Sequence, residues 1–213
     1  MSWELYHELT HNGDFVKTHY TCDPEKVIDE IYDFEFVKYN PSRPEILRDG
    51  LSVTSYDGGL SGYPDLHSLK DVYEETGESF SEEECTVLTP VYHDCPEVQK
   101  MCDPWLPWLK RTHFLKLPPG GFFPDHVDGG RIGNPTSFRL IVPIFNCNPP
   151  EMIFLVKPGT QYEVLNWEHG RTYFLNTSKR HLLFNASSED SIMLVMNIAM
   201  TRESVQKLRY KVY

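Results

Sequence analysis

The sequence predicts a mainly β protein, a sandwich or barrel, with a helical layer formed by its N-terminal half. In residues 112–200, short apolar runs recur between turn residues, with no helical pattern between them. Helix-start residues and helical spacing occur instead in residues 1–111. There is no internal repeat or low-complexity linker. We therefore expect a single domain over residues 1–213: a mixed α/β layer (1–111), a β core (112–200), and a C-terminal helix with its tail (201–213).

Four helices are predicted from their boundary residues. Asp23 before Pro24 is typical of a helix start, because a carboxylate caps the first turn and proline fits the first helical position. A second helix is expected from Ser68 to Thr76, where Gly77 would end it. The third is expected to start at residues 94–97, and Thr201 to cap a short helix over residues 202–208.

Seven strands are predicted from apolar runs that end at proline, glycine or asparagine. They cover residues 112–117, 138–145, 152–156, 161–165, 172–175, 181–185 and 192–200. Strands that follow one another without intervening helices are typical of sandwiches and barrels. Trp105 and Trp108, just before the first strand, are expected to pack the helical layer against the barrel.

Composition argues against several classes of protein. Lys and Arg number 20 and Asp and Glu 31, a net charge of −11, which repels nucleic acids and anionic membranes; we expect neither as a partner. No apolar run is long enough to cross a bilayer, and the N-terminus does not resemble a secretory signal. The five cysteines form no C-x-x-C pair, which indicates reduced thiols in a cytoplasmic protein.

The residues that indicate chemistry are His126 and Asp128, with His181 following 53 positions after Asp128. Alternate residues of a strand share a face, so His126 and Asp128 on one strand would point into the same cavity. His181 begins another apolar strand. Two imidazoles and one carboxylate on one face of a metal leave the opposite positions open, as in non-haem Fe(II) oxygenases.

Two other interpretations fit the same three residues. His126 and Asp128 can form a hydrogen-bonded pair in a turn after Pro124, with His181 a buried structural histidine. The same ligands also suit zinc, so a zinc hydrolase is a further hypothesis.

The motif around these residues resembles a known family. Residues 117–128 (Leu-Pro-Pro-Gly-Gly-Phe-Phe-Pro-Asp-His-Val-Asp), a strand that begins at Arg139, and residues 181–187 (His-Leu-Leu-Phe-Asn-Ala-Ser) are similar to 2-oxoglutarate/Fe(II)-dependent oxygenases of the aspartyl/asparaginyl β-hydroxylase and proline hydroxylase group. The similarity covers about residues 112–200. Residues 64–69 resemble, more loosely, the extensions of phage-type members.

The resemblance implies a double-stranded β-helix (a jelly roll, cupin-like), with two four-stranded sheets and the metal between them. It assigns Fe(II) to His126, Asp128 and His181, and it makes Arg139 a contact to a carboxylate of 2-oxoglutarate. A guanidinium suits that role because it binds a carboxylate through two parallel hydrogen bonds. The implied activity is hydroxylation of an amino-acid side chain (Asp, Asn or Pro) in a protein or peptide substrate or in a free amino acid.

The chain departs from the family at one position. Many members carry a second arginine about ten residues after the last histidine ligand, and this chain has Ser191 there. After Arg139, the candidates to hold the distal carboxylate are Lys157 and Arg131. The departure leaves two alternatives open: a cupin-type metalloenzyme that does not use 2-oxoglutarate, and a jelly-roll binding module without catalytic activity.

Overall fold

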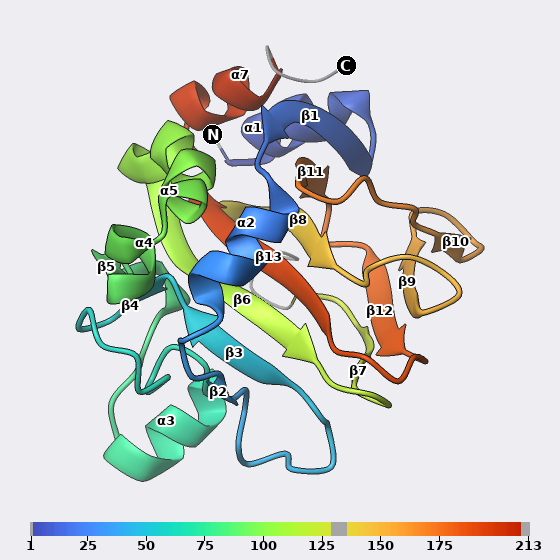
Figure 1. Cartoon of the computed structure of the whole chain (residues 1–213). Helices are drawn as coiled ribbons and strands as arrows, with labels where there is room; N and C mark the ends of the chain where they lie inside the picture. Colours follow the sequence, from blue (N-terminus) through green and yellow to red (C-terminus); the bar gives the residue numbers. More distant parts are fainter. Residues whose placement is uncertain (1, 129–135, 210–213) are drawn as a thin grey trace.

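The computed structural model describes residues 2–128 and 136–209, in which helices cover one face of a large antiparallel sheet (Figure 1). The helices are α1 (Ser2–Leu9), α2 (Pro24–Ile31), α3 (Leu69–Thr76), α4 (Pro90–Asp94), α5 (Pro96–Cys102) and α7 (Arg202–Arg209). Short 3-10 turns are η1 (Thr10–Asn12), η2 (Glu82–Glu84) and η3 (Asp103–Trp108). No helix of these residues is both long and apolar enough to cross a membrane.

The strands fall into a first group before the barrel and a second group that builds it. The first group is β1 (Phe15–Thr21), β2 (Val37–Lys38), β3 (Asp49–Ser52), β4 (Thr54–Ser55) and β5 (Val87–Leu88). The second group is β6 (Leu109–Leu117), β7 (Phe122–His126), β8 (Ser137–Phe145), β9 (Met152–Lys157), β10 (Glu163–Val164), β11 (Arg171–Leu175), β12 (Arg180–Asn185) and β13 (Ser191–Ala199).

The second group has the topology of a double-stranded β-helix, which confirms the predicted fold class. Four of its strands lie in the order β11-β8-β13-β6, and the other four form a separate sheet in the order β10-β9-β12-β7. The larger sheet continues beyond the barrel at both edges, with β1 beside β11 and β3-β2 beside β6, so it has seven strands where four were expected. A two-stranded sheet, β4-β5, stands apart.

Alternation along the strands of the larger sheet produces two apolar cores. On its outer face, side chains from the sheet pack against the helices; this core includes Leu51, Phe114, Leu140 and Leu194 from strands and Val27, Val98 and Val205 from helices. On its inner face, side chains pack against the smaller sheet; this core includes Leu115, Ile141, Val195, Phe154 and Leu183. In Figure 1, α2 and α5 lie on the outer face and β9 and β12 on the opposite side.

Three of the four predicted helix starts are confirmed by capping bonds, and the remaining one, at residues 94–97, is the start of α5, whose N-cap Cys95 makes no side-chain capping bond. The Asp23 carboxylate accepts a hydrogen bond from the amide of Lys26, and the Ser68 hydroxyl accepts one from Asp71. Gly77 ends α3 with a φ of 74°, a left-handed conformation that favours glycine. Thr201 accepts a hydrogen bond from the amide of Ser204 at 3.1 Å.

Trp105 joins the helical layer to the barrel, as predicted. Its side chain is fully buried. Its ring meets the rings of Tyr20 on β1 (centroids 5.3 Å apart) and Phe138 on β8 (6.2 Å) edge to face. The ammonium of Lys207 on α7 lies 5.8 Å above it. Trp105 therefore contacts three elements at once, whereas Trp108 is only half-buried.

Replacing Trp105 with alanine should lower the free energy of unfolding by about 3–5 kcal/mol, because the large cavity left behind cannot collapse between three packed elements. Trp108→Ala is the matched control and should cost about 1–2 kcal/mol, since its ring is partly solvated already. Urea denaturation followed by circular dichroism measures both. Equal losses in the two variants would contradict this role for Trp105.

Candidate metal centre

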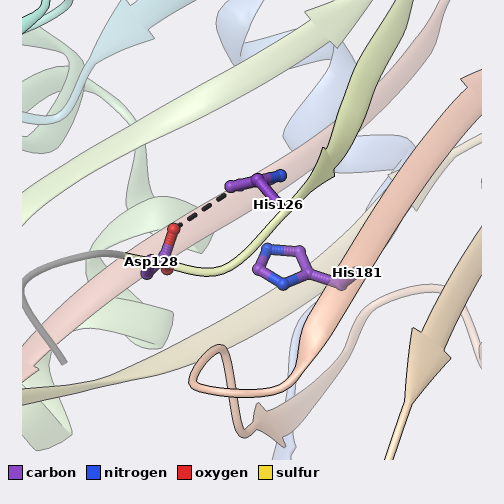
Figure 2. A group of neighbouring side chains, drawn as sticks. All are labelled: His126, Asp128 and His181. Atoms are coloured by element: carbon purple, nitrogen blue, oxygen red, sulfur yellow. Dashed lines mark ion pairs between the residues drawn. The ribbon is translucent and has the colours of Figure 1, made fainter. Parts of the chain in front are cut away.

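The structure brings His126, Asp128 and His181 together (Figure 2). One possible ligand atom from each lies within 4.8 Å of the others. Nε2 of His126 is 3.5 Å from Oδ1 of Asp128, and the two imidazole centroids are 4.2 Å apart. His126 and His181 face each other because β7 and β12 pair in a register that places them opposite one another.

A bulge in β7 turns His126 inward. From Leu183 to His181, β12 advances two residues, while β7 advances three from Phe123 to His126. The extra residue lies at Pro124-Asp125, in an edge strand, where proline and bulges are tolerated. Phe123 and His126 therefore face the same side, and their rings stack with centroids 5.3 Å apart.

The position of Asp128 differs from the one that the sequence predicts. It was expected on the same strand as His126, but β7 ends at His126 and Asp128 lies in the loop that follows. The loop is held by the amide of Asp128, which donates to the carbonyl of Thr177 at 3.1 Å. The carboxylate lies beside the imidazoles because of the conformation of this loop, and not because alternate residues of a strand share a face.

The two imidazoles are oriented by backbone carbonyls. Nδ1 of His126 lies 2.7 Å from the carbonyl oxygen of Pro124, and Nδ1 of His181 lies 2.9 Å from that of Lys179. A carbonyl only accepts hydrogen bonds, so each Nδ1 carries the proton and donates it. In the neutral tautomer with this contact, Nε2 is the nitrogen that is available to a metal, and the ring is fixed in place by its second nitrogen.

Burial keeps His181 neutral. Its side chain is 4% exposed, and burial lowers the pKa of its imidazole to about 4, with Asp128 acting in the opposite direction and His126 in the same direction. A neutral imidazole at pH 7 is the state that a metal ligand needs.

Arg139 fixes the orientation of Asp128. Its Nη1 lies 3.0 Å from Oδ2 of Asp128, while Oδ1 is the oxygen that faces His126. Its Nε donates to Oδ1 of Asn197 at 3.2 Å. A chain of contacts thus runs from β13 through β8 to the ligand loop, and it leaves one carboxylate oxygen for a metal. The assignment of Arg139 to a cosubstrate carboxylate stays a prediction beside this observed role.

The site lies between two hollows. The inner cavity, of about 40 Å³, lies inside the barrel and has apolar walls that include Leu115, Ile141, Phe154, Met193 and Val195. The outer cleft, of about 500 Å³, is lined by polar and aromatic residues that include Tyr39, Arg48, Arg111, Glu82 and Asp128. Phe123, His126 and Arg139 line both.

Two arginines of the outer cleft, Arg111 and Arg48, were not predicted as site residues from the sequence. Arg111, on β6, forms an ion pair with Glu82 (3.0 Å) and donates to the carbonyl of Asp65 and the hydroxyl of Tyr39. Arg48, just before β3, is 4% exposed and packs against aromatic rings. Neither belongs to a motif, and Arg48 comes to the site only because the short strand β3 pairs with β6.

The remaining predicted residues lie elsewhere. Lys157, at the end of β9, lies over the ring of Tyr162 and lines neither hollow. Arg131 is outside the described residues. Ser191 donates to the carbonyl of Asn146 at 2.6 Å and also lines neither hollow. Arg180 turns away from His181 and pairs with Asp125, as its neighbouring position on the strand predicts.

Comparison with solved structures supports the fold. A prolyl-4-hydroxylase from Pseudomonas putida superposes with a TM-score of 0.51 at 10% identity, over 92% of this chain and 99% of that chain. The nickel complex of the non-haem monooxygenase ThoJ gives 0.52 at 10% identity, over 92% and 77%. No family model and no curated sequence matches the chain. At 10% identity, the two superpositions show that the chain shares its fold with this prolyl-4-hydroxylase and with the monooxygenase ThoJ.

Proposed function

We propose that this protein is an Fe(II)-dependent oxygenase that uses 2-oxoglutarate and belongs with the aspartyl/asparaginyl β-hydroxylases and proline hydroxylases, near their phage-type members. One observation carries the proposal. Two imidazoles, each with its Nδ1 against a carbonyl, and one carboxylate converge from β7, β12 and the loop after β7 of a double-stranded β-helix. This donor set, with open positions on the other side, is typical of non-haem Fe(II) oxygenases.

The residues present fit a metal ion. His126 and His181 offer their Nε2 atoms as nitrogen ligands, and Asp128 offers one oxygen while Arg139 holds the other. The carboxylate offsets part of the charge of a divalent ion, and the carbonyl contacts prevent either ring from rotating. These three side chains would hold Fe(II) in a single arrangement and leave room for small ligands from the outer cleft.

The outer cleft fits a dicarboxylate better than the inner cavity does. At about 40 Å³ the inner cavity has room for a few water molecules, and its walls are apolar. The outer cleft is about 500 Å³, and Arg48, Arg111 and Arg139 line it. Bound there, Fe(II) and 2-oxoglutarate would supply the redox chemistry with dioxygen as the oxidant: one oxygen atom of O2 would enter succinate as 2-oxoglutarate loses CO2, and the other would convert a substrate C–H bond to C–OH.

The chain's own residues position this reaction. Arg139 keeps Asp128 from rotating, and the packed walls of the inner cavity keep bulk water from the His181 side of the site. The substrate must therefore arrive from the outer cleft. We propose an amino-acid side chain (Asp, Asn or Pro) of a protein, a peptide or a free amino acid as the substrate. The net charge of −11 favours these over a nucleic acid.

One observation favours a second candidate, a cupin-type metalloenzyme that does not use 2-oxoglutarate. The final barrel strand, β13, presents Met193 and Val195 to the inner cavity and carries no basic residue. The distal carboxylate therefore has no partner at the position where many relatives provide one.

Metal binding should depend on the three side chains. We expect one Fe(II), or Co(II) as a spectroscopic probe, per chain, and loss of stoichiometric binding in His126→Ala and His181→Ala. His93→Ala, which removes an exposed imidazole on α4, is the control and should bind normally. Equilibrium dialysis with metal analysis measures the stoichiometry. Unchanged metal content in the His181 variant would reject the site and favour a binding module without metal.

The use of 2-oxoglutarate should be visible spectroscopically. Without oxygen, addition of 2-oxoglutarate to the Fe(II)-loaded protein should produce a metal-to-ligand charge-transfer band in the visible range. With oxygen, slow formation of succinate should follow even in the absence of substrate. If the protein binds metal but neither binds nor consumes 2-oxoglutarate, the second candidate replaces the first.

Removal of the Arg139 guanidinium should weaken metal binding about 10–100-fold, the usual effect of losing a group that orients a metal ligand. In Arg139→Met the carboxylate of Asp128 is free to rotate. Arg180→Met is the matched control, because Arg180 adjoins His181 yet pairs with Asp125 on the other face. Competition with a fluorescent chelator gives both affinities. A metal affinity that Arg139→Met leaves unchanged would show that Arg139 does not orient Asp128.

A further inference from the structure

Arg48 is buried without a carboxylate partner. It lies directly before β3, is 4% exposed, and lines the outer cleft. Its Nε is enclosed and has no hydrogen-bond acceptor. Within residues 2–128 and 136–209, no ion pair or hydrogen bond of its guanidinium is present. A guanidinium stays charged at any physiological pH, so its five N–H donors need acceptors.

Arg111 provides the comparison within the same cleft. It is equally buried, and its Nε also has no acceptor, yet its two terminal nitrogens reach the carboxylate of Glu82, the carbonyl of Asp65 and the hydroxyl of Tyr39. Buried charges in proteins are normally paired in this way, because the loss of water has to be compensated. Arg48 is the exception, because its terminal nitrogens have no such partner. Burial lowers the pKa of its guanidinium; Arg43 and Arg111 act in the same direction, and Tyr39 and the more distant Glu45 act in the opposite direction.

Two aromatic rings hold Arg48 in position. Its guanidinium carbon lies 3.9 Å from the ring centroid of Phe123 and 4.8 Å from that of Tyr39. The Tyr39 amide also donates to the carbonyl of Arg48 at 3.1 Å. Cation–π contacts of this kind cover the faces of a guanidinium, but its N–H groups lie along the edges and remain available.

The position relative to the metal site follows from Phe123. Its ring contacts the Arg48 guanidinium and also stacks with the imidazole of His126, 5.3 Å away between centroids. Arg48 thus lies one aromatic ring away from a metal ligand, and both line the outer cleft. Arg139, which lines the same cleft, already pairs with Asp128.

We propose that Arg48 binds a carboxylate group of a small organic acid that occupies the outer cleft beside the metal site. The planar fork of a guanidinium matches a carboxylate through two parallel hydrogen bonds. The identity of the acid rests on the proposed function: it is either the distal carboxylate of 2-oxoglutarate, taking the place of the arginine that position 191 lacks, or a carboxylate of the substrate.

The experiment compares 2-oxoglutarate with 2-oxovalerate, an acid of the same length whose terminal methyl group replaces the distal carboxylate. Calorimetric titration uses the protein loaded with Zn(II), in wild type, Arg48→Met and the control Arg43→Met, which removes an exposed guanidinium from the same segment. Wild type and Arg43→Met should prefer 2-oxoglutarate by at least about tenfold, and Arg48→Met should lose that preference while its affinity for 2-oxovalerate and for Zn(II) stays within about twofold.

A second arm identifies the other source of the carboxylate. The same proteins, saturated with 2-oxoglutarate, are titrated with L-aspartate, L-asparagine and L-proline. Retained preference for 2-oxoglutarate together with at least tenfold weaker amino-acid binding in Arg48→Met would assign Arg48 to the substrate. If Arg48→Met changes none of these affinities, the proposal is wrong, whether or not the protein uses 2-oxoglutarate.

Two further measurements separate the possible failures. If the wild type does not bind 2-oxoglutarate, the proposed function is wrong, and titration of the metal-free protein with glutarate tests the proposal for Arg48 alone.

Thermal unfolding distinguishes a binding role of Arg48 from a structural role. If Arg48 were needed only for its contacts with the rings, its replacement would destabilise the unliganded protein. We expect Arg48→Met to be as stable as wild type or more so, since it removes an unpaired buried charge. Arg48→Lys, which keeps the charge but not the fork, should have intermediate affinity.

Discussion

The candidate metal site depends on the pairing of β7 with β12. Side chains alternate along a strand, so a slip of one residue would turn His126 or His181 to the other face of the smaller sheet. The register is fixed by Leu183, which is buried, between Leu182 and Phe184, which are not. The bulge at Pro124-Asp125 then adds the one residue that places Phe123 and His126 on the same side. Without this register the two imidazoles would not face each other beside Asp128.

The same bulge links the metal site to the outer cleft. The carbonyl of Pro124, within the bulge, accepts a hydrogen bond from Nδ1 of His126, and the ring of Phe123, just before the bulge, lies between His126 and Arg48. The bulge in β7 therefore favours one tautomer of His126 and also sets the distance between His126 and the guanidinium of Arg48. An edge strand permits this, because a bulge in a central strand would disrupt hydrogen bonds on both sides.

The barrel could be predicted from the sequence, and much of its surroundings could not. Strands such as 138–145 and 181–185 are apolar runs with clear turn residues at their ends, and these were located to within a residue or two. By contrast, β3 has only the four residues Asp-Gly-Leu-Ser, and it forms because it pairs with β6 more than 60 positions later. No local sequence pattern predicts such a strand, so the position of Arg48 beside the site could not be predicted from the sequence. Asp128 was placed on a strand because local alternation does not reveal where the ladder ends.

The distribution of charge explains why the N-terminal segment belongs to the site. In the barrel, β13 turns Met193 and Val195 inward, and the inner cavity between the sheets is small and apolar. None of the described residues that line this cavity is acidic, and Arg139 already pairs with Asp128 beside it. The further basic groups near the site, Arg48 and Arg111, lie instead where the larger sheet extends past β6. There, Tyr39 and Arg48 lie between β3 and the edge strand β7, against the ring of Phe123, and they line a polar cleft. Under the proposed function, residues outside the eight barrel strands would thus supply the basic group that the final barrel strand lacks, and an acid would bind on the open side of the candidate metal ligands.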